Sequence, residues 1–145
     1  MHMIVKDFMT SLIVTADTSV LVIDAAKLMA IERIGSLIVT RNDVLEGIVT
    51  RQDVLAARLM SDDTYKSLTV EEIMQSPVVS ISPDADLGQL VTLMNQTGKT
   101  HIPVLSGDEI IGLVSSSDII RTLATVKQIA DGAILDDDDT YEESE

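Results

Sequence analysis

The sequence contains no cysteine and no tryptophan, and only three of its 145 residues are aromatic. Without cysteine the chain can form no disulfide, no thiolate metal site and no cysteine nucleophile. The apolar 46% of the chain must therefore build its core from Val, Ile, Leu, Met and Ala, which suits mixed α/β packing. No apolar run approaches the roughly 20 residues of a transmembrane helix, and no signal-peptide pattern opens the sequence. We expect a soluble, cytoplasmic protein with no membrane partner.

Basic residues are scarce as well, and unevenly distributed. The net charge is −14, and residues 131–145 hold eight acids and no base, which leaves 16 acids against 10 bases, a net charge of −6, in residues 1–130. Because a run of aspartates cannot pack in a core, the sequence predicts an acidic, disordered tail over residues 131–145. The acidic body argues against nucleic acid as a partner.

What the chain does contain is an internal repeat with a period of 65 residues. Gly-Ile-Val-Thr-Arg-Gln-Asp at 47–53 falls on Gly-Leu-Val-Ser-Ser-Ser-Asp at 112–118, and Leu28-Met29 falls on Leu93-Met94. Each copy alone is near the lower size limit for a stable core, so the two copies should share one. We divide the chain into a first repeat at 1–60, a polar linker at 61–69, a second repeat at 70–130 and the tail at 131–145.

The residue pattern predicts the same elements in both repeats. The apolar, β-branched run at 12–15 predicts a strand, and the apolar spacing from Val22 to Met29 predicts a helix. Two strands at 37–40 and 45–49 flank a polar turn, and a second helix should cover 51–60 in one repeat and 116–130 in the other. Pro103 lies in one of these strands, so its nitrogen should not face a partner strand. The predicted fold class is α/β (α+β), with two pseudo-symmetric β-α-β-β-α repeats.

One motif, Gly-aliphatic-Val-Thr/Ser-x-x-Asp, ends a strand and begins a helix in each repeat. It places Thr50 and Asp53 in the first repeat, and Ser115 and Asp118 in the second. The free N–H groups and dipole of a helix start favour an anion, the hydroxyl can bond a phosphate or ribose oxygen, and the carboxylate can accept both protons of a cis-diol. The same residues also fit a capping box that only closes the helix. Their recurrence after the same strand end favours the binding interpretation.

These motifs, in this order, resemble a tandem pair of CBS domains, known as a Bateman module. The resemblance rests on Val-x-x-Phe/Ile-Met at the start of each repeat, the helical Leu-Met pair, the segment His101-Ile102-Pro103-Val104 and the two Thr/Ser-x-x-Asp motifs. It implies a regulatory module that senses AMP, ADP or ATP in clefts between the repeats and controls a separate partner. S-adenosylmethionine is the alternative ligand, and a structural dimerisation module without a ligand is the alternative role.

The resemblance also implies a role for each candidate residue. The aspartates would hold ribose hydroxyls, the Thr and Ser hydroxyls would bond ribose or the α-phosphate, the first strands would flank adenine, and the hairpin entries would close the base pocket. The candidate ligand-binding residues are Val14, Thr15, Ile38, Thr50, Arg51, Asp53, Val79, Ser80, Lys99, His101, Pro103, Ser115, Asp118 and Arg121.

The two copies differ in their charged residues. Arg51 of the first repeat has Ser116 as its equivalent, whereas Lys99, His101 and Arg121 of the second repeat have Ile34, Ser36 and Ala56. We therefore expect Arg51 to meet the phosphate in one site, and the Lys99/His101/Arg121 group to meet it in the other.

The sequence offers little support for catalysis, because the two histidines stand in no triad or metal-ligand spacing. We expect no enzyme activity, no metal and no resident cofactor. A homodimer is expected, since aliphatic residues follow each motif aspartate and suit a closed two-fold interface. The candidates for that surface are Val54, Leu55, Ile119, Ile120 and Leu123.

Overall fold

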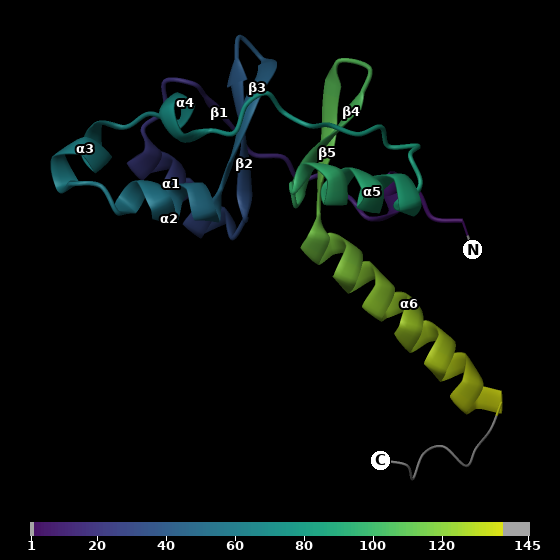
Figure 1. The fold of residues 1–145 in the computed structure, drawn as a ribbon. Coiled ribbons are helices and arrows are strands. Elements are labelled where there is room, and N and C mark those ends of the chain that lie inside the picture. The colour runs from purple at the N-terminus through teal and green to yellow at the C-terminus, as the bar shows by residue number, and fades with distance from the viewer. Residues whose placement is uncertain (1, 138–145) are drawn as a thin grey trace.

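The computed structural model describes residues 2–137, with side chains as far as residue 132. Its elements are η1 (Val5–Asp7), β1 (Thr15–Asp17), α1 (Val22–Glu32), β2 (Ser36–Arg41), β3 (Val44–Thr50), α2 (Arg51–Arg58), α3 (Asp62–Ser67), α4 (Val70–Ile73), α5 (Leu87–Thr97), β4 (His101–Ser106), β5 (Glu109–Ser115) and α6 (Ser116–Asp137). Figure 1 shows two β-hairpins side by side, each with its own helices. This confirms the predicted fold class of two similar repeats.

The two sheets differ in their first strand. In the first repeat β1 pairs with β2 in parallel, and β2 pairs with β3 antiparallel. In the second repeat β4 and β5 form the hairpin, and only the bridge between Ile81 and Val104 stands where β1 would be. The Ile38 N–H donates to the Val14 carbonyl at 3.1 Å, a bond that Pro103 at the equivalent position cannot make because it has no N–H. The strand predicted at 12–15 is thus observed at Thr15–Asp17, and its second copy is reduced to one bridge.

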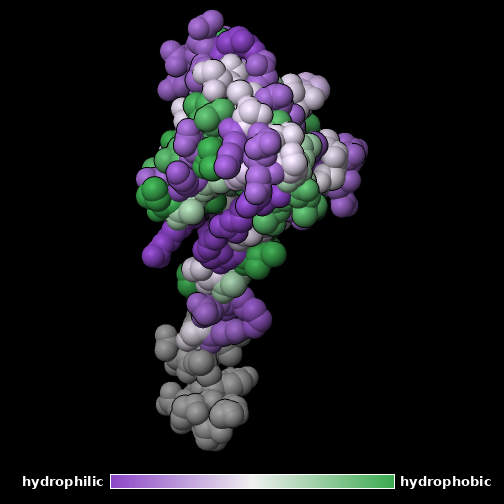
Figure 2. Space-filling model, turned by 90° about the vertical axis from the view of Figure 1, so that its left-hand side faces the viewer, coloured by the Kyte–Doolittle hydropathy of each residue, from purple (hydrophilic) through white to green (hydrophobic). Residues whose placement is uncertain are grey.

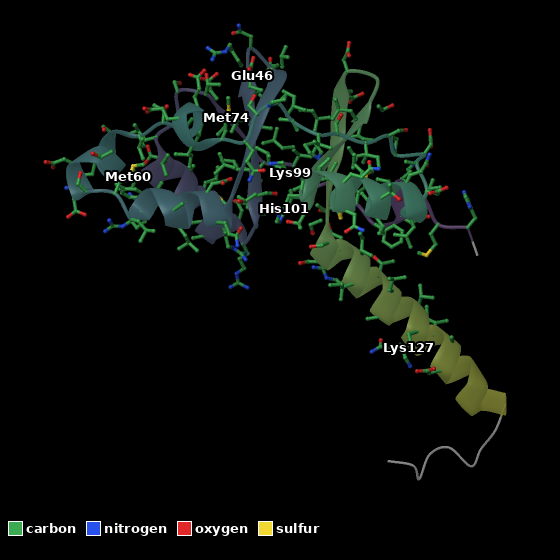
Figure 3. All side chains as sticks on the ribbon, viewed as in Figure 1. Glu46, Met60, Met74, Lys99, His101 and Lys127 are labelled. Carbon is green, nitrogen blue, oxygen red and sulfur yellow. The ribbon has the colours of Figure 1, made fainter. Side chains whose placement is uncertain are left out.

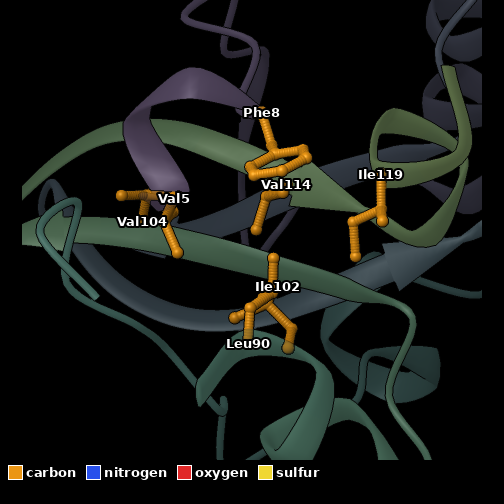
Figure 4. Close-up of a cluster of buried hydrophobic side chains, with 7 residues drawn as sticks. All are labelled: Val5, Phe8, Leu90, Ile102, Val104, Val114 and Ile119. Atoms are coloured by element: carbon orange, nitrogen blue, oxygen red, sulfur yellow. The ribbon is translucent and has the colours of Figure 1, made fainter. Parts of the chain in front are cut away.

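The segments that begin the two repeats are exchanged. Residues of η1 pack against the second repeat, where Val5 and Phe8 join the buried core of β4, β5, α5 and α6 (Figure 4). The Thr10 N–H and carbonyl bond with Leu113 of β5 at 2.9 Å each. Likewise α4 packs on the first repeat, where Val70 is fully buried. A cut at residue 61–69 therefore does not separate two independent cores.

A glycine in each hairpin makes the exchange possible. A Cβ atom on Gly112 would lie 2.6 Å from Met9 Sδ and 2.9 Å from the Thr10 carbonyl oxygen, and one on Gly47 would lie 2.7 Å from Met74 Cγ. These motif glycines accommodate a close approach because they carry no side chain. The approaching group is the exchanged segment of the other repeat.

Two predicted segments contain helix that the sequence analysis did not assign to them. The stretch at 61–69, predicted as a polar linker, contains helix α3, because Ser61 caps it and Tyr65 is buried against Val22 and Ala57. Helix α6 continues to Asp137, so residues 131–137 of the predicted disordered tail are helical. A pair from Lys127 to Asp131, four residues apart at 2.7 Å, spans the predicted boundary. The rest of the tail, 138–145, lies outside the described residues.

The face drawn in Figure 2 carries several separate apolar patches. Figure 2 shows them on the flanks of the body and on α6, which runs away from the rest of the fold in Figure 1. Of the residues predicted for a dimer surface, Leu55, Ile120 and Leu123 are exposed, whereas Ile119 belongs to the core and Val54 is half-buried. Among the described residues, no helix is long and apolar enough to cross a bilayer.

Candidate functional site

Both Thr/Ser-x-x-Asp motifs form closed capping boxes. The Asp53 carboxylate accepts from the Thr50 N–H at 2.8 Å and from its hydroxyl at 3.0 Å, while the Asp53 N–H donates back to that hydroxyl at 3.4 Å. Ser115 and Asp118 repeat the geometry, with 2.8, 3.0 and 3.2 Å. The capping interpretation of the motif is therefore realised at both helix starts.

The capping boxes change what the helix starts can offer a ligand. The first N–H of α2, from Arg51, donates to the Gly35 carbonyl, and that of α6, from Ser116, donates to the Thr100 carbonyl. Helix N–H groups predicted to be free for an anion are thus partly engaged. The second oxygen of Asp118 accepts from Arg121 at 3.0 Å, and the Asp53 carboxylate accepts from Gln75 at 3.1 Å. A ribose diol would have to share each carboxylate with these donors.

A cavity at the seam between the two repeats, which we name cavity 1, has a volume of about 450 Å³, within the usual range for small-molecule pockets. Its apolar wall comes mainly from the first repeat and includes Val14 and Ile38. Its polar wall includes Ser115 and Asp118 of the second repeat. Cavity 1 therefore brings residues predicted to contact adenine in the first repeat next to residues predicted to contact ribose in the second repeat.

Two further cavities occupy the seam. Cavity 2, of about 480 Å³, is lined by Thr50, Arg51, Lys99 and His101 together with other polar residues. Cavity 3, of about 10 Å³, is lined by Val79, Lys99 and His101 among others. Of the predicted site residues, Thr15 and Ser80 are exposed, Pro103 is buried within β4, and Asp53 faces Gln75; none of these four lines the three cavities.

The cations are arranged differently from the sequence-based prediction. Arg51 and Arg121, assigned to separate sites, both line cavity 1, and Arg51 also lines cavity 2 with Lys99. His101 lines all three cavities and lies, like Lys99, between the two hairpins (Figure 3). Arg33 also lines cavity 1, so four of the chain's ten Lys and Arg residues line cavities 1 and 2. Because the chain as a whole is acidic, this local group of cations should attract anions to the seam.

His101 is the titratable residue at the centre of the seam. Burial lowers its pKa below the ordinary 6.5, because a desolvated imidazolium is disfavoured. The Arg51 guanidinium lowers the pKa further, while the Asp118 and Asp53 carboxylates oppose the shift. Its Nδ1 lies 3.3 Å from the Thr100 hydroxyl. A neutral imidazole can therefore hydrogen-bond a ligand and can gain a proton when a negative charge arrives.

Among the lining residues that the sequence-based prediction missed are Arg33 and Ser36, which stand where the repeats differ. Arg33 ends α1 in the left-handed conformation, with φ of 56°, at the position of Gly98 in the second repeat. Ser36 is 4% exposed, and its hydroxyl has no hydrogen-bond partner among the described residues. A comparison of the two repeats could have singled out Arg33, because its equivalent is Gly98 and glycine is the usual residue at such a helix C-cap. The orphan hydroxyl of Ser36 is visible only in the structure.

Among the residues that the structure describes, no three His, Cys, Asp or Glu side chains are grouped as they would be around a metal ion. What the seam offers instead is an apolar wall, hydroxyls beside a carboxylate, and several cations. This combination suits an organic anion.

Comparisons with known proteins agree with the repeat. The family model of the CBS domain matches residues 5–60 and again residues 70–125. The chain is 29% identical over 115 residues to the CBS domain-containing protein YhcV of Bacillus subtilis, covering 79% of this chain and 81% of that protein. It is 30% identical over 107 residues to the mitochondrial CBS domain-containing protein CBSX3 of Arabidopsis thaliana, and that match covers 70% of this chain but only 52% of the relative.

A solved structure extends the comparison to ligands. The CBS domain pair of protein MJ0100 superimposes with a TM-score of 0.77 and 26% identity, covering 86% of this chain and 98% of that one. That protein was crystallised in complex with 5′-methylthioadenosine and S-adenosyl-L-methionine.

Proposed function

The chain belongs to the CBS domain family, and we propose that it is a regulatory module that binds an adenosine nucleotide at the seam and controls a separate partner. The observation that carries the proposal is the composition of cavity 1. An apolar wall with Val14 and Ile38 suits a purine, the Ser115 hydroxyl and Asp118 carboxylate suit ribose, and the guanidinium groups suit phosphate. The complex of the MJ0100 pair with two adenosine compounds supports the ligand class.

The same cavity explains how a ligand would act. Its walls come from both repeats, so a bound nucleotide would contact both and favour one packing of the pair. A ligand at 100 times its Kd stabilises the state that binds it by about 2.7 kcal/mol. Such a gain is enough to change the population of a poised interface roughly a hundredfold. The exposed Leu55, Ile120 and Leu123 are the surface we propose for a homodimer, whose mass light scattering would reveal.

S-adenosylmethionine is the second candidate, favoured by the MJ0100 complex. Its carboxylate could pair with an arginine, but its sulfonium would bring a positive charge near Arg33, Arg51 and Arg121. A phosphate would instead be attracted by these three guanidinium groups, which outnumber the Glu32 and Asp118 carboxylates that also line the cavity. We therefore place AMP, ADP and ATP ahead of S-adenosylmethionine.

Isothermal titration calorimetry tests the proposal. We expect AMP, ADP or ATP to bind, S-adenosylmethionine to bind more weakly, and ribose 5-phosphate, which has no base, to bind much more weakly than AMP. If none of the adenosine compounds produced a heat of binding and none raised the melting temperature of the protein, the two Thr/Ser-x-x-Asp motifs would serve only as helix caps. The module would then have a structural role.

A further inference from the structure

The 65-residue repeat relates the three cavities to one another. Leu12, Ile13 and Val14 line cavity 1, and their equivalents Pro77, Val78 and Val79 line cavity 3. At the polar end, Ser115 and Ser117 line cavity 1, and their equivalents Thr50 and Gln52 line cavity 2. Cavities 3 and 2 are thus the two ends of the second copy of the site.

The apolar end of the second copy is closed. Its volume of about 10 Å³ is about that of one water molecule, so it cannot accept a purine. Two substitutions between the repeats contribute: Lys99 stands where the first repeat has Ile34, and His101 stands where it has Ser36. Both longer polar side chains line the closed cavity.

The polar end of the second copy is open and cationic. Arg51, Lys99 and His101 line cavity 2, and none of the described residues that line it is a carboxylate. Arg51 and His101, with Gly35 and Ser117, also line cavity 1. The two cavities therefore share a wall that includes the Arg51 guanidinium.

Cavity 1 retains an unsatisfied group that points to a ligand. Burying a hydroxyl without a partner costs roughly 1–3 kcal/mol, yet Ser36, a residue that lines cavity 1 and is 4% exposed, has a hydroxyl with no hydrogen-bond partner among the described residues. The hydroxyl is itself closed off from solvent, so a ligand in cavity 1 would bond it only if the cavity wall shifted slightly.

We propose that each chain binds one adenosine ligand, with its base in cavity 1 and its phosphate chain passing Arg51 and His101 into cavity 2, toward Lys99. This rests on the proposed function and makes it more specific. The second copy of the site acts as a phosphate subsite instead of a second nucleoside site. A ligand with two or three phosphates then gains contacts that AMP cannot reach.

Titration of the whole chain with adenosine, AMP and ATP tests the proposal. We expect one ligand per chain, with ATP bound more tightly than AMP. Lys99→Ala should weaken ATP about tenfold or more, as expected for the loss of a charged hydrogen bond, and AMP less than twofold. Lys66→Ala, at an exposed lysine of α3, is the matched control and should change neither. The melting temperature of each variant shows that it is folded.

A second variant tests the base position. Ile34→Lys places in cavity 1 the lysine that the second repeat has at the equivalent position, Lys99, and should abolish binding of adenosine itself. Ile34→Met keeps an apolar side chain there and should retain adenosine binding. Two nucleosides per chain, or an equal loss for ATP and AMP in Lys99→Ala, would overturn the inference. Absence of binding by every adenosine compound would instead overturn the proposed function on which it rests.

Discussion

The two repeats are alike where the backbone is determined and unlike where a ligand would lie. Each has a hairpin, a capping box after it, and a glycine that admits the exchanged segment of the other repeat. At the seam, however, Ile34 and Ser36 of one repeat have Lys99 and His101 as their equivalents in the other. The comparison teaches that a repeated fold does not imply a repeated site.

The largest expected difference concerns the exchanged segments. Phe8 is 4% exposed in the core of the second repeat, and its equivalent Ile73 is only half-buried on the first. Phe8→Ala should lower the free energy of unfolding by about 3–5 kcal/mol, and Ile73→Ala should cost clearly less. Urea unfolding measures both. Equal losses of unfolding free energy in the two variants would mean that the two exchanged segments contribute equally to stability.

The two motif aspartates should separate stability from binding. Asp118 lines cavity 1, whereas Asp53 is held by Gln75 away from the cavities. Asp118→Ala should weaken nucleotide binding by about 1.5–3 kcal/mol, and Asp53→Ala should change it less than about twofold. Both variants lose a capping box and should lose about 1 kcal/mol of stability. A similar binding loss in both would return Asp53 to the ligand site.

The two close-approach glycines offer a smaller contrast. At Gly112 an added methyl would meet the Thr10 backbone carbonyl, whereas at Gly47 it would meet only the flexible Met74 side chain. Gly112→Ala should therefore destabilise by about 1–3 kcal/mol, and Gly47→Ala by less. Thermal unfolding of the pair checks this order, which equal melting temperatures would refute.

The smallest effect should come from pH. The pKa of His101 is lowered in the folded chain, so the unfolded chain binds a proton more readily. Its contribution to stability is complete above the unfolded pKa of 6.5 and is lost as pH falls through the lower folded value. Unfolding at several pH values should show a steeper acid loss for wild type than for His101→Gln, a variant that keeps Arg51, Asp53 and Asp118 around the site. Identical pH profiles would contradict the buried imidazole.

Much of the fold could be predicted because it depends on local pattern repeated twice. The two hairpins and the helices after Thr50 and Ser115 follow from such patterns. The assignment of residues to each cavity could not be predicted in this way, because cavity 1 combines residues from opposite halves of the chain. Residue types alone also could not show that Tyr65 of α3 is buried against Val22 and Ala57, or that the Ser36 hydroxyl has no hydrogen-bond partner among the described residues.

The central claim is that one adenosine ligand lies across an unequal pair of half-sites. A crystal structure of the chain grown with ADP tests it most directly. We predict a single nucleotide per chain, with its base against Val14 and Ile38, its ribose at Asp118 and its terminal phosphate toward Lys99. A base seated instead against Val79 and Pro103, or a nucleotide in each half, would contradict the account.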